Sequence, residues 1–338
     1  MNILITGGNG QLGNELQTIS DSIKGVWWLP LRLPDKYIGL DYPCFFFEDV
    51  DMLDITSYSA VEFYCIKRDI TAIINVAAYT AVDKAENDAD AAYKVNEAGV
   101  RTLSQVCIKH NIFLLHLSSD YVFDGAANEP YDENAATNPQ SIYGKSKLAG
   151  ERAMIESGVN GIIMRTSWLY SSFGNNFVKT MLRLGGENKE IKVVNDQIGS
   201  PTYAADLADA VLQLLAYSCE TNDLLQRRIL NAPQNGIQKS DVEIFHYTNS
   251  GVCSWSEFAS EIMRIAGLPC KIIPVSTEEY NSAVLSPVAP RPKYSVLNTS
   301  KIQQILKTDI PSWQDSLKKS LALFNQKVHS SVERTYYY

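Results

Sequence analysis

The chain has 338 residues, of which 45% are hydrophobic and 20% charged, a composition typical of folded rather than disordered or fibrous proteins. Its formal net charge of -8 gives no electrostatic reason to expect a nucleic-acid partner. No apolar run approaches the ~18 residues of a membrane span, and the N-terminus lacks the basic and apolar regions of a signal peptide. We therefore expect a cytoplasmic protein without a membrane partner, acting as a monomer or a homodimer.

Cysteine and histidine spacing argues against a metal site. The six cysteines are scattered with no C-x-x-C pair, and the four histidines show neither H-x-H nor H-x-x-x-H spacing. This pattern indicates thiols of a reducing compartment and no protein-bound zinc. We assign no metal ligands from these residues.

The first half of the chain alternates short apolar runs with helical patterns. We predict strands at Asn2–Ile5, Cys44–Glu48, Ala72–Val76, Phe113–Ser118 and Gly161–Ser167, and helices at Gln11–Ile19, Ala89–His110 and Ile142–Ile155. Such alternation favours an α/β fold with a doubly wound parallel sheet of the Rossmann type. Two stretches, Trp28–Tyr42 and Gln226–Asp241, look like insertions between these elements.

Beyond Tyr170 the pattern is less regular. Ser254 and Glu257 form an S-x-x-E capping box, which predicts a helix that ends near Gly267. Prolines 287, 290 and 292 mark an irregular segment, and a further helix begins within Asn298–Leu306. We assign residues 1–170 to a dinucleotide-binding domain, to which 195–250 return in part, 171–330 mainly to a smaller C-terminal α/β substrate domain, and 331–338 to a mobile tail.

A glycine-rich turn follows the first predicted strand directly. The run Gly7–Gly13 satisfies G-x-G-x-x-G from its second residue and G-x-x-G-x-x-G from its first. Glycines let the chain turn tightly and let a pyrophosphate approach the backbone, while the following helix supplies amides and positive potential. A glycine triplet alone is a weak signal, but its place between a strand and a helix predicts a dinucleotide site.

The position of the second strand in the sequence determines which residue lies next to the adenosine ribose. If Cys44–Glu48 is that strand, Asp49 follows it and is placed to bond the ribose hydroxyls. The rival strand Val26–Leu31 would instead end at Arg32 and favour a 2′-phosphate. Pro30 interrupts this rival run, so we prefer Asp49.

Tyr143 and Lys147 form a Y-x-x-x-K pattern on a predicted helix, and the i,i+4 spacing places them on one face. A phenol with a pKa near ~10 exchanges protons poorly at neutral pH, and we expect the ammonium together with an oxidised nicotinamide to lower that pKa. Lys145 points elsewhere and serves as an internal control. By itself this spacing usually means a surface pair.

Two strand ends strengthen the interpretation of that pair. Ser119 and Asp120 end the fourth predicted strand, and Asn75–Tyr79 ends the third with small residues where a cofactor would pass. Ligands of doubly wound sheets gather at the carboxyl ends of the strands. We therefore predict a carbonyl-reducing site in which Ser119 bonds the substrate carbonyl while Tyr143 donates the proton.

These motifs resemble the extended short-chain dehydrogenase/reductases, and within them the dTDP-4-dehydrorhamnose reductase family. The resemblance spans nearly the whole chain. The matching segments are ILITGGNGQLGNEL, AAYTAVDKAE, SSDYVFDG, YGKSKLAGE, RTSWLY, GNNFVKTMLRL, NDQIGSPT and RPKYSVLNTSK.

The resemblance implies two sets of binding residues beside the catalytic Ser119, Tyr143 and Lys147. The residues expected at the nicotinamide cofactor are Gly7, Gly10, Gln11, Leu12, Gly13, Asp49, Asp54, Ile55, Ala78, Tyr79, Thr80, Leu117, Tyr143 and Lys147. The residues expected at the substrate are Ser119, Asp120, Trp168, Asn175, Asn176 and Arg291, with Asn195-Asp196-Gln197 as further candidates. Ser119 stands where the family often has threonine, so the hydroxyl is kept and only a methyl group is lost.

The implied reaction is hydride transfer from NADPH or NADH to the C4 keto group of dTDP-4-dehydro-L-rhamnose, giving dTDP-L-rhamnose. Asp49 favours NADH because a carboxylate repels a 2′-phosphate, but Lys36 could compensate. Some family members use Mg²⁺ at a dimer contact, and we assign no acidic cluster to it. Two rivals stay open: another sugar-nucleotide epimerase or dehydratase, and a non-catalytic regulatory subunit of the same fold.

Overall fold

The computed structural model describes residues 1–334 except 25–36, 38–39, 41–42, 222–241 and 283–287, and it leaves out 335–338. Most of the predicted insertion Trp28–Tyr42 and all of Gln226–Asp241 therefore lie outside the described residues, as do the rival strand Val26–Leu31 and Lys36. Residues 331–334 of the predicted tail belong to the last helix, α13 (Trp313–Arg334).

The centre of the molecule is a parallel sheet of six strands in the order β10-β5-β4-β3-β1-β2. Their bounds are β1 Asn2–Thr6, β2 Cys44–Glu48, β3 Ala72–Asn75, β4 Phe113–Ser119, β5 Gly161–Thr166 and β10 Val242–His246. The predicted fold class is confirmed, and the bounds of the five predicted strands agree with the structure to within one residue. The chain leaves β1 toward β2 on one side and returns to β3 on the other, so the topological switch point lies between β1 and β3.

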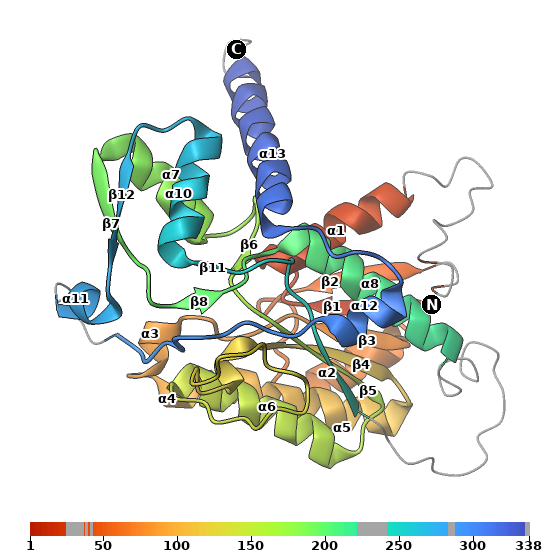
Figure 1. Ribbon diagram of the computed structural model, residues 1–338. Coiled ribbons are helices and arrows are strands. Elements are labelled where there is room, and N and C mark those ends of the chain that lie inside the picture. Colours follow the sequence, from red (N-terminus) through yellow and green to blue (C-terminus); the bar gives the residue numbers. More distant parts are fainter. Residues whose placement is uncertain (25–36, 38–39, 41–42, 222–241, 283–287, 335–338) are drawn as a thin grey trace.

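Helices cover both faces of this sheet, as Figure 1 shows. One face packs against α1 and α8, and the other against α2 and α5. The helices of this part are α1 Gln11–Lys24, α2 Tyr58–Lys67, α3 Val82–Ala85, α4 Ala89–Tyr93, α5 Val100–His110, α6 Ile142–Ser157 and α8 Ala204–Thr221. The middle strands β1, β3 and β4 are buried along almost their whole length, as expected for a sheet covered on both faces.

The predicted helix 89–110 is not continuous. A π-helical segment, Lys94–Gly99, separates α4 from α5. Segments of this type insert an extra residue into a helix and often occur at functional sites. Here the segment lies against α6, and a Cβ on Gly150 would approach the carbonyl oxygen of Asn96 to 2.1 Å. Gly150 is therefore required for this close helix contact.

A second group of elements has its own hydrophobic core. It contains α7 Phe177–Glu187, α10 Trp255–Ala266, α13 and three pairs of strands: β7 Glu190–Val194 with β12 Lys271–Val275, β6 Leu169–Tyr170 with β9 Thr202–Tyr203, and β8 Ile198–Gly199 with β11 Cys253–Ser254. The short helices α11 Thr277–Ser282 and α12 Ser300–Leu306 complete the described chain.

The capping box predicted for this second group is confirmed. The Ser254 hydroxyl accepts a hydrogen bond from the Glu257 amide, the Glu257 side chain accepts from the Ser254 amide, and Gly267 ends α10 with a φ of 66°. Side chains of α8 and β10 pack instead into the core of the large sheet. We therefore keep our domain boundaries, including the partial return of 195–250, as a proposal.

A buried ion pair ties α6 to the sheet. Nε and Nη2 of Arg165 on β5 donate to the two carboxylate oxygens of Glu151 on α6, at 2.8 and 2.6 Å, and the two side chains are 3% and 1% exposed. The Arg165 guanidinium also lies 5.2 Å from the centre of the Phe123 ring. Helix α6 also carries Tyr143 and Lys147, the predicted catalytic residues. The Arg165–Glu151 pair therefore helps to fix the distance of these two residues from the sheet.

Removing one partner of this pair should destabilise the fold strongly. We expect Glu151→Gln to lower the free energy of unfolding by about 3–5 kcal/mol, because it leaves the Arg165 charge buried without its counter-ion. Glu97→Gln is the matched control, since the Arg101–Glu97 pair is exposed and its loss costs about 1 kcal/mol or less. Urea unfolding measures both, and equal effects would contradict the role given to the buried pair.

Candidate functional site

The glycine turn lies where β1 meets α1, at the switch point of the sheet. Gly7 has a φ of 74°, and a Cβ there would come within 2.7 Å of the Ala77 backbone after β3. A Cβ on Gly13 would lie 2.5 Å from the Gly7 and Gly8 carbonyl oxygens. These two glycines are therefore needed for the turn itself and for its approach to β3.

Gly10 has more room around it than Gly7 and Gly13, and this difference bears on whether the turn fits a dinucleotide. A Cβ at Gly10 would meet only the Gly7 carbonyl oxygen, at 3.2 Å. Internal packing therefore does not demand glycine here, whereas the close approach of a ligand would. Because α1 begins at Gln11, the amides of Gln11, Leu12 and Gly13 have no intrahelical acceptor and offer positive potential to a phosphate.

Asp49 lies where the prediction placed it, directly after β2 and beside the turn. Its carboxylate accepts hydrogen bonds from the Asn9 amide at 3.0 Å and from the Val50 amide at 2.7 Å. The carboxylate of Asp54 accepts the Thr56 amide and hydroxyl, and these bonds lower its pKa. The Ile55 side chain is buried against Gly99 of the π-helical segment.

Ser119, Tyr143 and Lys147 converge at the carboxyl end of β4. Helix α6 begins just before Tyr143 because the Ser141 hydroxyl accepts a hydrogen bond from the Gly144 amide at 3.1 Å. Lys147 is only 2% exposed, and its Nζ donates to the Leu117 carbonyl at 2.6 Å. The helix is thereby held over β4, and Ser119 at the end of that strand hydrogen-bonds with the Tyr143 phenol.

Burial shifts the acidities of these groups. Burial raises the pKa of Tyr143 to about 12, and the hydrogen bond with Ser119 opposes this only in part. Burial lowers the pKa of Lys147 to about 8, against the opposing charge of Glu151. In the protein's own surroundings the pKa of Tyr143 is thus raised, because burial and the charge of Asp120 outweigh the hydrogen bond with Ser119. The expected lowering, which also requires an oxidised nicotinamide, stays a prediction. A protonated phenol is the form that can donate a proton.

Asp120 is a buried acid in contact with Ser119. It is 2% exposed, and its Oδ1 accepts a hydrogen bond from the Ser119 hydroxyl at 2.9 Å. Burial raises the pKa of Asp120 to about 6, while Ser295 and Ser119 partly offset this. The neighbouring Tyr121, which sequence reasoning missed, packs edge-on against the Tyr143 ring with centroids 5.3 Å apart.

Asn96 is a second residue that the sequence did not single out. It lies on the π-helical segment, is 1% exposed, and exchanges hydrogen bonds with the Tyr79 backbone at 2.9 and 3.1 Å. Its amide also donates to the Ser146 hydroxyl at 2.9 Å, and Ser146 donates to the Tyr143 carbonyl at 2.8 Å. Asn96 thus joins the predicted cofactor segment Ala78–Thr80 to helix α6.

Trp168 and Asn176 approach the site from the second group of elements. Trp168 lies just beyond β5 and has a φ of 48°. The side-chain amide of Asn176 donates to the Gln11 side chain at 2.9 Å, so the segment before α7 is anchored on the glycine turn. Asn175 beside it is exposed to solvent.

The other predicted substrate residues already have protein partners. Both outer nitrogens of Arg291 bond the Asp83 carboxylate, at 3.0 and 2.8 Å, close to Tyr121. The Asp196 carboxylate accepts the Thr277 amide at the start of α11, and the Gln197 amide donates to the Thr277 hydroxyl at 3.0 Å. The Asn195 backbone amide donates a hydrogen bond to the Val275 carbonyl at the end of β12, at 2.9 Å.

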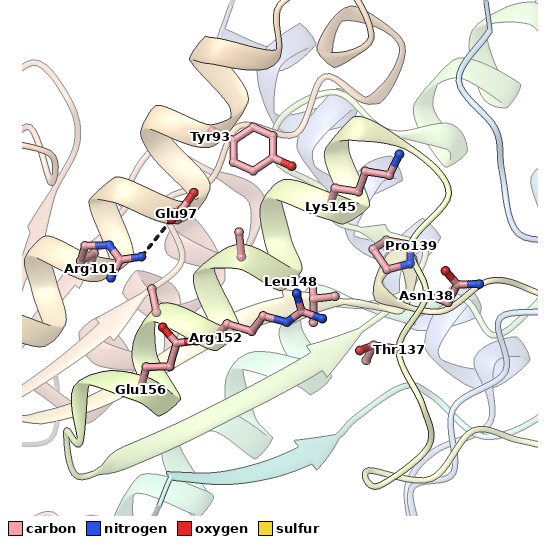
Figure 2. A pocket seen from close by; sticks show the side chains of 12 residues that line it. Tyr93, Glu97, Arg101, Thr137, Asn138, Pro139, Lys145, Leu148, Arg152 and Glu156 are labelled. Carbon is pink, nitrogen blue, oxygen red and sulfur yellow. Dashed lines mark hydrogen bonds and ion pairs between the residues drawn. The ribbon is translucent and has the colours of Figure 1, made fainter.

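Lys145 lies on the outer side of α6, away from Tyr143 and Lys147. It lines a groove of about 440 Å³ between α6 and the segments that carry Tyr93 and Glu97. Figure 2 shows the Lys145 side chain among the residues of this groove. Lys145 is exposed whereas Lys147 is buried. The two lysines therefore differ in environment as the helical spacing predicted.

The described part of the chain offers neither a metal-binding cluster nor a helix that could span a membrane. Within those ranges, no group of three or more His, Cys, Asp or Glu side chains is arranged to hold a metal ion. None of the helices described there is long and apolar enough to cross a membrane.

Comparison with known proteins identifies the family. The family model of the RmlD substrate binding domain matches residues 1–326. A curated dTDP-4-dehydrorhamnose reductase of Escherichia coli is 36% identical, over 95% of this chain and 97% of that protein.

Two solved structures agree. A dTDP-4-dehydrorhamnose reductase of Clostridium acetobutylicum is 39% identical with a TM-score of 0.78, covering 96% of this chain and all of that one (100%). One from Bacillus anthracis, in complex with NADP, is 37% identical with a TM-score of 0.77 and covers 95% of this chain and 98% of its own. The resemblance seen in the sequence motifs is confirmed, and the chain belongs to the dTDP-4-dehydrorhamnose reductase family.

Proposed function

We propose that this protein reduces the C4 keto group of dTDP-4-dehydro-L-rhamnose to give dTDP-L-rhamnose. The observation that supports this most strongly is the convergence of Ser119, Tyr143 and Lys147 at the edge of the sheet where Gly10 leaves room for a ligand. The family membership supplies the substrate class.

Each of these side chains has a distinct task in the proposal. The Ser119 hydroxyl polarises the keto oxygen, and Tyr143 gives its proton to the alkoxide that develops there. The raised pKa of Tyr143 keeps that proton in place at neutral pH. Lys147, fixed by the Leu117 carbonyl, holds a positive charge beneath the site and offers its remaining donors to the cofactor ribose.

A nicotinamide cofactor supplies the hydride when it is bound. We propose that the Gly7–Gly13 turn and the start of α1 hold its pyrophosphate, that Asp49, Asp54 and Ile55 lie at its adenosine end, and that Ala78–Thr80 and Leu117 border its path. The relative from Bacillus anthracis was solved with NADP, and Asp49 favours NADH. We therefore propose that both NADPH and NADH serve, and parallel assays with each measure the preference.

For the substrate we propose contacts from Asp120, Trp168, Asn175, Asn176 and Arg291. A Mg²⁺ ion, which the family resemblance suggests, would act outside this chemistry. Comparing turnover and molecular mass with and without EDTA tests that part of the proposal.

Replacing Tyr143 tests the proton donor. We expect Tyr143→Phe to lower kcat by about a hundredfold or more, because the ring is kept and only the proton is lost. Oxidation of NADPH or NADH on addition of dTDP-4-dehydro-L-rhamnose measures the rate, and cofactor titration should give an unchanged Kd. A variant with near wild-type turnover would refute the assignment. Wild-type protein that binds cofactor and substrate without turnover would favour the regulatory-subunit alternative.

The two lysines of α6 make a matched pair. Lys147→Ala should weaken cofactor binding and lower kcat, because it removes the buried charge and leaves the Leu117 carbonyl without its donor. Lys145→Ala, two residues away on the exposed side, should leave both nearly unchanged. Steady-state kinetics and cofactor titration measure kcat and cofactor affinity of the two variants. Comparable losses of kcat and affinity in both would exclude a specific role for Lys147.

The buried charge of Asp120 should lower the stability of the folded protein at neutral pH. The Asp120 pKa of about 6 exceeds the ~3.9 of an unfolded aspartate, so the contribution of this one group favours the folded state most below pH ~4, and about 3 kcal/mol of that contribution is lost as the pH rises through ~6. Asp120→Asn should remove this loss, unfolding with a higher free energy than wild type at pH ~8 and a similar one near pH ~4, while turnover falls. Urea unfolding across this range checks it. A stability difference that does not vary with pH would contradict the proposed burial of the charge.

A further inference from the structure

The backbone of Trp168 is held in an unusual conformation. Its φ of 48° lies in the left-handed region, which bulky side chains rarely adopt. Residues persist there when their surroundings over-determine them, and such positions cluster at ligand sites. The neighbours of Trp168 therefore show what holds the indole in place.

One neighbour is Gly199 on β8, against the edge of the indole. A Cβ on Gly199 would lie 2.6 Å from Cε2 and 2.8 Å from Nε1 of Trp168. The strand is kept there by β11, because Gly199 pairs with Cys253 in the antiparallel β8–β11 ladder. Any larger residue at position 199 would displace the ring.

The other neighbour is Trp255, against the face of the indole. The Trp168 and Trp255 rings are stacked with centroids 3.6 Å apart and planes inclined by 9°. Trp255 is the first residue of α10, and the capping box of Ser254 and Glu257 fixes where that helix begins. One face of Trp168 is therefore covered by the Trp255 ring, whose position is fixed by the first turn of α10.

Trp168 lies next to the proposed chemistry. Ser119 at the end of β4 pairs with Thr166 on β5, and Trp168 follows two residues later. The structure also connects the stack to the glycine turn. Phe177 lies against Trp255 with centroids 4.5 Å apart, and Asn176 just before it bonds Gln11.

We propose that Trp255, together with Gly199, is a positioning residue that sets the indole of Trp168 as a wall of the sugar-nucleotide site. This inference rests on the proposed function, which places the substrate against Trp168. Trp255 covers one face of the indole, and in this proposal the substrate lies against the other. Trp255 acts on substrate binding through Trp168 and takes no part in proton or hydride transfer.

The test compares Trp255→Leu, Trp255→Phe and Gly199→Ala with the matched control Trp313→Phe. Trp313 belongs to the same aromatic cluster, edge-on to Phe258 at 5.6 Å, but does not stack on Trp168. We expect Trp255→Leu and Gly199→Ala to raise the KM for dTDP-4-dehydro-L-rhamnose by roughly tenfold to a hundredfold, with the KM for NADPH unchanged. Trp255→Phe should keep most of the substrate affinity because an aromatic face remains.

A spectroscopic signature accompanies the kinetics. Two indoles stacked this closely give an exciton couplet in the far-UV circular dichroism spectrum. Trp168→Phe and Trp255→Phe should each abolish the couplet, and Trp313→Phe should keep it. Loss of the couplet in Trp255→Leu together with a wild-type KM for the sugar nucleotide would overturn the inference, and so would equal KM effects of Trp255→Leu and Trp313→Phe.

Failure of the proposed function would look different. Wild-type protein would then show the couplet but no turnover of the 4-keto sugar. Calorimetric titration with dTDP decides in that case: weaker binding by Trp255→Leu than by wild type and Trp313→Phe supports the positioning role. Equal binding by all of them, or no binding by any, overturns it.

Discussion

The placement of the site depends on one buried charge. The Lys147 ammonium is removed from water and finds its acceptor in the main chain of β4, at the Leu117 carbonyl. Burying an ammonium is costly unless it is hydrogen-bonded, so helix α6 is stable in this position only while that bond is made. The same bond sets Tyr143, one helical turn earlier, over the end of the strand that carries Ser119. The Arg165–Glu151 pair secures the next turn of the helix to the neighbouring strand.

Burial also determines how the groups share their protons. Tyr143 and Asp120 lie close together in a region that disfavours negative charge, and both have raised pKa values. Lys147 has a lowered pKa for the same reason, because burial disfavours the charged form of either sign. A site of this kind holds a proton on its phenol until a stronger base, the reduced carbonyl oxygen, appears.

The sequence was sufficient for the architecture and for much of the site. Apolar runs bounded by turns located five of the six strands of the large sheet to within a residue, because strands covered on both faces are mostly apolar. Asp49 was placed correctly after β2 because Pro30 made the rival strand unfavourable. The family motifs then located Ser119, Tyr143 and Lys147 on neighbouring elements.

What the sequence missed depends on contacts between distant segments. The π-helical turn at Asn96 requires Gly150 and Ser146 on another helix, so no local pattern announces it. The direction of the Tyr143 pKa follows from how deeply α6 is buried, which spacing alone does not reveal. The role of Trp255 requires the register of β8 with β11, two strands of two residues each.

The ion pair of Arg291 with Asp83 joins residues 208 positions apart. All three proposed catalytic side chains precede residue 150, whereas Trp255 and Arg291 are made in the last quarter of the chain. The sheet beneath the catalytic side chains also needs α8 and β10, so its core closes only after residue 246 has been made. The two halves of the site are therefore completed close together in time, although their residues lie far apart in the sequence.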